Sequence, residues 1–279
     1  MQVLTGKLAR ISAVFVLTVI VAGCDIAVDG HGGLGFGLAA GKANDQWTRT
    51  YQVAPGGRLE LINVNGRITA EASDGSAVEV VADRTAKATT DEAAKDLLGR
   101  IEMREEVGAD RVRVEVRAPR MSGPSGHEFT WTVKVPRGVS VDLRTVNGRI
   151  HVANLDADVR ARSTNGGIKG TALVASSVDA AVTNGGVDIE MAKAVTTGTF
   201  ELEAVNGGVS INLPADSRAD IAGRCVNGGI STSDLPLEMV GEQTRRRLDA
   251  TLNGGGARIS LETVNGGVRI GRAGSPTTN

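Results

Sequence analysis

The sequence is poor in the residues that most often build metal sites, with three histidines and two cysteines among 279 residues. His31 falls in a glycine-rich segment, His127 in an expected loop and His151 at an outward strand position, so their spacing is not typical of zinc ligands. Basic and acidic residues nearly balance, at 31 and 32. Nucleic-acid binding depends on neutralising phosphates, so this balance gives no electrostatic basis for it. We predict no metal, no cofactor and no nucleic-acid partner.

The sequence also lacks a membrane-spanning run near its N-terminus. Lys7 and Arg10 precede an apolar stretch over residues 11–21, and crossing a hydrocarbon core takes about 20 helical residues. This layout predicts a secretory signal. Its end, Val21-Ala22-Gly23-Cys24, resembles the lipobox of bacterial lipoproteins, and the resemblance implies cleavage before Cys24 and lipid attachment to Cys24. The alternative is an ordinary signal peptide with a chance cysteine.

The lipobox resemblance sets the expected location and the chemistry of the second cysteine. Two or more acyl chains give stable membrane attachment, so we expect a cell-envelope protein, periplasmic or surface-exposed, lipid-anchored to the inner or the outer membrane. With Cys24 lipidated, Cys225 has no intramolecular disulfide partner. Cys225 occupies a slot that other repeats fill with small residues, and we interpret it as a packing residue.

The chain divides into segments of different composition. We predict a signal peptide over residues 1–23, a glycine-rich tether over 24–46, a β-rich cap region over 47–135, repeats over 136–272 and a disordered tail over 273–279. The tether has no sustained apolar alternation that could offset its ordering entropy.

In the cap region, alternating and β-branched residues predict strands over 58–64, 77–81, 101–106, 111–117 and 129–135. The sequence also predicts one short helix from Thr90 to Leu98, because Thr90 can cap it and Asp91 and Glu92 suit its positive end.

Glycine is abundant, with 37 residues, and much of it lies in an internal repeat, Asn-Gly-Gly/Arg-Ile/Val. The repeated asparagines are Asn147, Asn165, Asn184, Asn206, Asn227 and Asn265. An outlying copy lies at Asn65 and a degenerate one at Asn253. The first spacings are near 20 residues, but 38 residues separate the last two copies, so we expect one diverged repeat between them. Residues 231–249 fit the pattern poorly.

Polar and apolar residues alternate on both sides of each Asn-Gly, so each repeat reads as two short strands with one buried face. The near-constant period favours an all-β fold, a β-solenoid or single-stranded β-helix, in which the asparagines form a ladder along one corner. A meander of hairpins is the alternative, because Asn-Gly also favours two-residue hairpin turns.

Several of these motifs occur together in a known order. They are Leu59-Glu60 to Asn65-Gly66, the helix after Thr90, Val133-Lys134-Val135-Pro136-Arg137-Gly138-Val139 and the Thr-Val-Asn-Gly series. The region over residues 47–272 resembles the bacterial putative-adhesin family, a domain of unknown function. The resemblance implies a β-helical envelope protein linked with adhesion or envelope-stress systems, and it carries over no enzymatic residues.

We therefore expect a non-catalytic, lipid-anchored binding or structural protein. Its partners are a membrane, through the lipid, and an envelope polymer, lipid headgroups or another envelope protein. The alternatives are a carbohydrate-active enzyme and an accessory or sensory component of an envelope-stress system. An enzyme would need paired carboxylates, for which Glu201 with Glu203, or Asp188 with Glu190, have strand spacing. We interpret these pairs as an outer polar face.

Charge is segregated along the repeats, with an excess of basic residues over 137–170 and of acidic residues over 179–203. In a stacked solenoid this predicts a basic stripe beside an acidic one. The sequence predicts a patch for an anionic partner, acting through its field rather than specific readout. Its residues are Arg144, Arg149, Arg160, Arg162 and Lys169.

Overall fold

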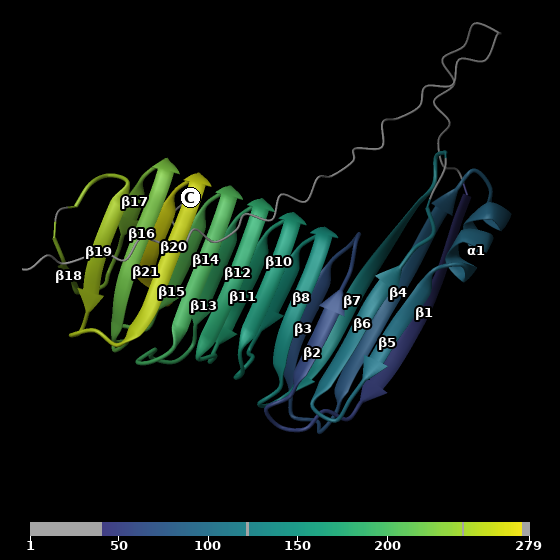
Figure 1. Ribbon diagram of the computed structural model, residues 1–279, viewed down its shortest axis with the longest axis horizontal. Helices are drawn as coiled ribbons and strands as arrows, with labels where there is room; N and C mark the ends of the chain where they lie inside the picture. Colours follow the sequence, from purple (N-terminus) through teal and green to yellow (C-terminus); the bar gives the residue numbers. More distant parts are fainter. Residues whose placement is uncertain (1–40, 121–122, 242, 275–279) are drawn as a thin grey trace, which may run out of the picture. The chain divides into compact units, whose positions relative to one another are not determined.

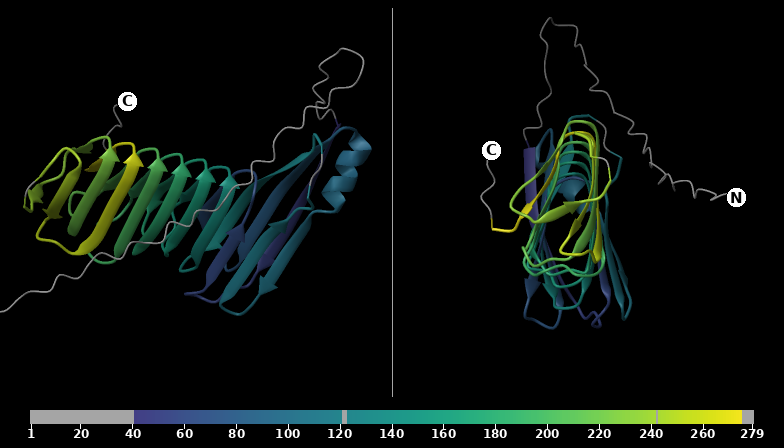
Figure 2. Two further views of the ribbon diagram at one scale, coloured as in Figure 1. Left: turned by 45° about the horizontal axis from the view of Figure 1, so that its top comes forward. Right: turned by 90° about the vertical axis from the view of Figure 1, so that its left-hand side faces the viewer.

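A computed structural model describes residues 41–120, 123–241 and 243–274. The predicted signal peptide, Cys24, His31, residues 24–40 of the tether and most of the expected tail lie outside these residues. The described part contains two large sheets, which face each other across a narrow interior when viewed along the stack of strands (Figure 2). Within it, no helix has the length and apolarity needed to cross a membrane.

The first sheet, sheet A, has ten strands, mostly parallel. In spatial order they are β1 (Gly41–Tyr51), β4 (Val78–Ala88), β7 (Gly126–Pro136), β3 (Ile68–Ser73), β9 (Ile150–Ala153), β11 (Ile168–Leu173), β13 (Val187–Met191), β15 (Val209–Leu213), β21 (Val268–Arg272) and β17 (Ile230–Thr232).

The second sheet, sheet B, has eleven strands. In spatial order they are β18 (Leu237–Met239), β19 (Arg247–Leu252), β16 (Ala219–Asn227), β20 (Ala257–Asn265), β14 (Thr199–Asn206), β12 (Ser177–Asn184), β10 (Val159–Asn165), β8 (Ser140–Asn147), β2 (Arg58–Ile62), β6 (Arg111–Arg117) and β5 (Glu102–Val107).

Each repeat contributes one strand to each sheet, with its Asn-Gly corner between them; we call such a pair a rung. For example, β10 in sheet B ends at Asn165, and β11 in sheet A begins at Ile168. Neighbouring rungs pair in parallel register, so that Asn165 aligns with Asn147 and with Asn184. The strands on either side of a corner belong to different sheets, which is incompatible with a meander of hairpins. The arrangement is solenoid-like.

The aliphatic residue three positions after five of the six repeated asparagines is buried in the space between the sheets, and Ile230, after Asn227, is partly buried. Ile150, Ile168, Val187, Val209 and Val268 are each at most 2% exposed. Burying such a side chain stabilises the fold by roughly 1.5–3 kcal/mol. The predicted alternation of buried and polar residues is confirmed for these strands.

The rungs begin earlier in the chain than residue 136. Strands β2 and β3 pair in parallel with β8 and β9, and Asn65 forms a bridge with Asn147. The predicted boundary between a cap region and the repeats is therefore wrong, because Asn65-Gly66-Arg67-Ile68 folds as the first corner of the same stack. Asn65 is a full member rather than an outlying copy.

Beyond the first rung, each sheet continues through one more parallel strand, β7 in sheet A and β6 in sheet B, and then through antiparallel strands. Strands β1, β4 and β7 continue sheet A, and β5 forms a hairpin with β6 in sheet B. Strand β1 starts at Gly41, so residues 41–46 belong to a strand rather than to the predicted tether. The predicted helix is confirmed as α1 (Asp91–Gly99), and the Thr90 side chain accepts a hydrogen bond from the Ala93 N–H. Helix α1 packs against β1 and β4 (Figure 1).

The order of the last rungs in space differs from their order in the chain. Strand β20, which ends at Asn265, lies between β14 and β16 (Figure 1). Asn265 thus aligns with Asn206 on one side and Asn227 on the other. The expected diverged repeat is wrong: the 38-residue spacing is an excursion, after which the chain returns to insert its last rung between two earlier ones.

The excursion forms the C-terminal edge of sheet B. Strands β19 and β18 add there in antiparallel orientation, and three-residue strands such as β18 leave little free edge for other chains to pair with. Asn253 has a positive φ of 49° and lies outside the asparagine register. Its side-chain amide donates to the Ala215 and Ser217 carbonyls at 2.9 and 2.8 Å.

Candidate binding groove

Two columns of glycine follow the repeated asparagines, and the first column is required by the corner. A Cβ on Gly207 would lie 1.9 Å from the Gly185 carbonyl oxygen, and one on Gly166 would lie 2.1 Å from that of Gly148. Both glycines have positive φ, at 158° and 140°. Only glycine fits this position, because neighbouring backbones approach too closely for a side chain.

The second column is different, because a side chain there would require a shift of only a few tenths of an ångström. A Cβ on Gly186 or Gly208 would lie 3.2 or 3.3 Å from the nearest carbonyl oxygen, and neither residue has a positive φ in the left-handed region. The first two rungs carry arginine at this position, Arg67 and Arg149. The corner therefore does not require the second glycine, whose effect is to leave space above the backbone.

This space is part of a groove on the outer face of sheet A, with a volume of about 1040 Å³. Two outward columns line it. The position two after each asparagine contributes Arg67, Arg149, Gly167, Gly186, Gly208, Gly267 and Gly229, and the position four after it contributes Thr69, His151, Lys169, Asp188, Ser210, Arg269 and Ser231. The groove, which we call the sheet A groove, thus crosses seven rungs.

Cations dominate the charged groups of the sheet A groove. Arg67, Arg149, Lys169 and Arg269 are exposed, and none of them forms an ion pair with another residue in the described part of the chain. The one carboxylate in the lining, Asp188, accepts a hydrogen bond from Ser210 Oγ at 2.6 Å. The groove therefore carries a net positive charge.

The arrangement of these cations has an energetic cost. Arg67 and Arg149 precede the aligned residues Ile68 and Ile150 on neighbouring strands, so their guanidinium groups start from equivalent positions about 4.8 Å apart. Like charges directly opposite each other in a sheet destabilise it. Arg67 and Arg149 thus place two like charges side by side at one end of the groove.

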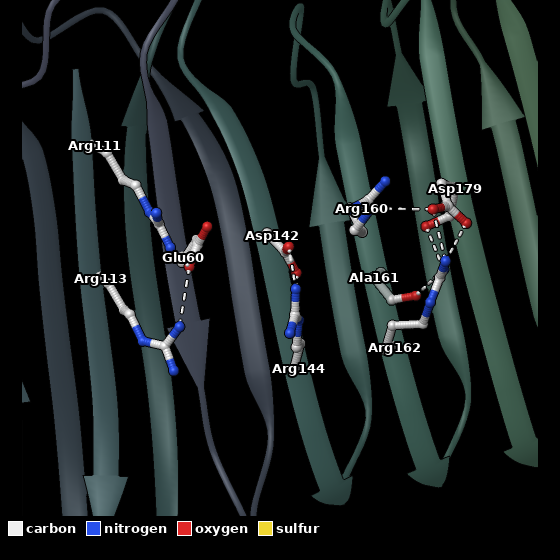
Figure 3. A network of polar contacts seen from close by, with 9 residues as sticks. All are labelled: Glu60, Arg111, Arg113, Asp142, Arg144, Arg160, Ala161, Arg162 and Asp179. Carbon is white, nitrogen blue, oxygen red and sulfur yellow. Dashed lines mark hydrogen bonds and ion pairs between the residues drawn. The ribbon is translucent and has the colours of Figure 1, made fainter. Parts of the chain in front are cut away.

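The structure divides the basic patch predicted from the sequence. Arg149 and Lys169 lie in the sheet A groove, whereas Arg144, Arg160 and Arg162 lie on the outer face of sheet B (Figure 3). The prediction of a single patch is wrong, because residues on opposite sides of an Asn-Gly corner belong to different sheets. The sequence analysis missed Arg67 and Arg269, which the alignment of the repeats could have found.

The sheet B arginines are paired with carboxylates. Arg144 donates two hydrogen bonds to Asp142, at 2.9 and 2.7 Å. Arg160 and Arg162 both pair with Asp179 on the next strand, at 3.0 and 2.6 Å (Figure 3). The predicted basic and acidic stripes thus neutralise each other where they meet.

The repeated asparagines form a ladder of side-chain amides along the corner. Each Nδ2 donates to the Oδ1 of the preceding rung at 2.7 or 2.8 Å, in the order Asn65, Asn147, Asn165, Asn184, Asn206, Asn265, Asn227. The ladder contains Asn65, which the sequence analysis left outside it. It fixes the corner next to the groove.

The carboxylates considered for catalysis lie in two places. Glu201 and Glu203 are exposed on sheet B, and Glu203 aligns with Glu262 on the neighbouring strand. Partial desolvation of the carboxyl group by its neighbours, and then the charge of Glu262, raise the pKa of Glu203. Asp188 lines the sheet A groove, and Glu190 follows it on β13.

The histidines and Cys225 are dispersed. His127 lies in strand β7 rather than in a loop, and it is buried, which lowers its pKa. His151 lines the groove, with Nε2 3.2 Å from Thr171 Oγ1. Cys225 is buried, in the slot expected for it. No cluster of three or more histidine, cysteine, aspartate or glutamate side chains suited to a metal occurs among residues 41–120, 123–241 and 243–274.

The chain is similar to several known proteins. The sequence profile of the family described as Toastrack DUF4097 matches residues 131–271. A "putative cell adhesion protein" from Clostridium sporogenes is 11% identical, with 82% of this chain and 100% of that chain covered and a TM-score of 0.48. A "putative adhesin" from Bacteroides fragilis is 12% identical, with 81% and 97% covered and a TM-score of 0.40.

A third solved structure, a "putative lipid binding protein" from Parabacteroides distasonis, is 10% identical, with 81% of this chain and 96% of that chain covered and a TM-score of 0.30. No curated protein matches the chain.

Proposed function

The chain belongs to the Toastrack DUF4097 family, and on that premise we propose that it is a non-catalytic binding protein of the bacterial cell envelope. A lipid on Cys24 holds its mature N-terminus at a membrane, because diacylated and more heavily acylated chains stay attached. A β-solenoid of Asn-Gly-Gly rungs is the scaffold, and the sheet A groove is the binding surface.

One observation carries this proposal: the groove is open and cationic although the fold does not require either property. The second glycine column could hold side chains, as Arg67 and Arg149 show. The exposed cations have no carboxylate partners in the described residues, unlike those of sheet B. A surface shaped only for solubility would gain from filling the groove and pairing its charges.

The partner we propose is a linear acidic polysaccharide. Seven rungs about 4.8 Å apart give the groove a length of roughly 29 Å, which suits an extended polymer better than a single headgroup. Cations near both ends, at Arg67 and Arg269, match a chain with repeated negative charges. An acidic peptide would more readily add to a sheet edge than lie across strands whose backbone groups are already paired.

Binding to a defined polymer tests the proposal. We expect the purified full-length lipoprotein in detergent micelles to bind fluorescent polygalacturonate, with an affinity that falls as salt screens the charges. Changing Arg67, Arg149 and Lys169 together to serine should weaken binding at least about tenfold, if each contact contributes about 0.5–1 kcal/mol.

The matched control changes Arg144, Arg160 and Arg162 of sheet B to serine, which removes the same charge from the other face. This variant should bind about as well as the unchanged protein. Equal losses in the two variants would show that net charge alone acts, and no loss in either would refute the groove as the binding surface.

The same mixtures test whether the protein is catalytic. The second candidate is a carbohydrate-active enzyme, in which Glu203 would act as general acid, because partial desolvation and the charge of Glu262 raise its pKa. We expect polymer length to stay constant over a long incubation. Shortening that disappears in Glu203→Gln would support the enzyme instead.

Fractionation tests the lipid anchor separately from the groove. We expect the intact protein in the membrane pellet, labelled by a clickable palmitate analogue, and Cys24→Ala in the soluble fraction without label. An unlabelled wild-type protein in the soluble fraction would exclude the lipid anchor but leave the groove proposal standing.

A further inference from the structure

The corner ladder consists of Asn-Gly pairs, which are chemically labile. The chain has eight of them, seven in the ladder and one at Asn253. The backbone nitrogen of the glycine can attack the side-chain carbonyl carbon of the asparagine, and glycine has no Cβ to hinder that approach. Whether the reaction occurs depends on what engages the glycine N–H and the asparagine amide.

In six of the seven ladder corners, the glycine N–H is engaged by the next rung. Gly148 N–H, for example, donates to the Asn165 carbonyl at 2.8 Å, and Gly207 N–H donates to the Asn265 carbonyl at 2.9 Å. The corresponding bonds of Gly66, Gly166, Gly185 and Gly266 are 2.7–2.9 Å long. In all six corners the asparagine Oδ1 also accepts a bond from the following Nδ2.

Asn227 ends the ladder, and its corner lacks both contacts. Within the described residues, the Gly228 N–H and the Asn227 Oδ1 have no hydrogen-bond partner. The turn that covers this edge does not supply one: Cys225 N–H donates to the Arg246 carbonyl and Ile230 N–H to the Arg245 carbonyl, on either side of Gly228. Because β20 lies between β14 and β16, Asn227 rather than Asn265 is the last asparagine of the ladder.

We propose that Asn227 is a site of spontaneous deamidation through a cyclic imide. The Gly228 nitrogen loses its proton and forms a bond to Cγ of Asn227, the Cγ–Nδ2 bond breaks, and the amide nitrogen leaves as ammonia with that proton. Water then adds to either imide carbonyl and breaks one of its two C–N bonds to the Gly228 nitrogen. The products are aspartate, with the original backbone, and isoaspartate, with one additional backbone methylene.

The modification would act on the last rung and on the groove. Asn227 Nδ2 donates to Asn265 Oδ1 at 2.8 Å, and a carboxylate in its place cannot donate. The new negative charge lies two residues from Gly229, which lines the groove, so an aged protein would present a less positive groove at that end. This inference rests on the ladder geometry alone and does not depend on the identity of the groove's partner.

Peptide mapping of one ageing sample tests the proposal, because the six engaged Asn-Gly corners of the ladder are internal controls. The purified full-length lipoprotein in detergent is held at mildly alkaline pH, and deamidated peptides are quantified over time by mass spectrometry that distinguishes isoaspartate. Because two hydrogen bonds must break before the reaction, the six engaged sites should react roughly fivefold or more slowly than Asn227.

Two further samples keep the result interpretable. In denaturant the ladder sites should deamidate at similar rates, since each asparagine is followed by glycine. Faster deamidation of Asn227 in denaturant would show that its reactivity comes from the local sequence instead. In Asn265→Ala, Asn206 loses the partner of its Oδ1 but Gly207 keeps its backbone bond, so Asn206 should remain slow. Uniform rates in the folded protein, or fastest reaction at an engaged site, would overturn the proposal.

Discussion

The outer faces of the two sheets carry charged residues from the same repeats but arrange them in opposite ways. On sheet B, Arg144 pairs with Asp142, and Arg160 and Arg162 pair with Asp179. On sheet A, Arg67, Arg149, Lys169 and Arg269 surround an open groove without such partners among the described residues. These sheet B arginines are paired with carboxylates of their own face, whereas the cations of the sheet A groove are left available.

The same contrast separates the two glycine columns, which are adjacent in sequence. The first glycine makes the close backbone contact of the corner, and the second leaves more room, with a Cβ on Gly208 at 3.3 Å from the nearest carbonyl oxygen. A repeat can therefore keep the corner constant while the next position changes between arginine and glycine. This independence allows a structural repeat to carry a binding surface.

The largest expected effect tests the contrast between the glycine columns. Gly207→Ala places a Cβ 1.9 Å from a carbonyl oxygen and should lower the free energy of unfolding by about 3 kcal/mol or more. Gly208→Ala places it at 3.3 Å and should cost less than about 1 kcal/mol. Urea denaturation followed by circular dichroism measures both. Equal costs would show that both columns are structural.

The second test concerns the paired face. Asp142 is 2% exposed and accepts both bonds from Arg144, so Asp142→Asn should cost about 2 kcal/mol by leaving that guanidinium without its partner. Arg149→Gln, on the other face, should change the free energy of unfolding by less than about 0.5 kcal/mol. A cost for Arg149→Gln as large as that for Asp142→Asn would mean that Arg149 has a structural role.

The features that the sequence predicted correctly are those with local causes. The Thr90 cap and the buried aliphatic residue after most corners follow from side-chain chemistry within a few positions of the chain. Parallel register follows from the repeat itself, because aligned asparagines also align Ile168 with Ile150.

The order of the rungs has no local cause and could not be predicted. The corners at Asn227 and Asn265 present nearly the same residues to a neighbour, Asn-Gly-Gly-Ile and Asn-Gly-Gly-Val, so either could stack on Asn206. The path of residues 231–252 decides between them. Likewise, sequence spacing placed Arg144 near Arg149, but the corner between them turns the two side chains onto different sheets.

The smallest expected effects on stability come from the two like-charged pairs, one on each face. Glu203 and Glu262 align on neighbouring strands of sheet B, and partial desolvation with the Glu262 charge raises the pKa of Glu203. The folded state then binds that proton more tightly than the unfolded state, so stability is highest below the ordinary glutamate pKa and falls as the pH rises through the folded-state pKa. Glu203→Gln should therefore raise the melting temperature near neutral pH and leave it unchanged at about pH 4.

Arg149→Gln provides the matching measurement on sheet A. Removing one of two like charges should stabilise by a few tenths of a kcal/mol, and equally at about pH 4 and about pH 7, because arginine does not titrate in this range. Melting curves at both pH values distinguish the two faces. The gain in melting temperature should depend on pH for Glu203→Gln on sheet B and be independent of pH for Arg149→Gln on sheet A. If Arg149→Gln instead lowers the melting temperature, Arg67 and Arg149 do not repel each other. Their proximity then gives no reason to expect an anionic partner.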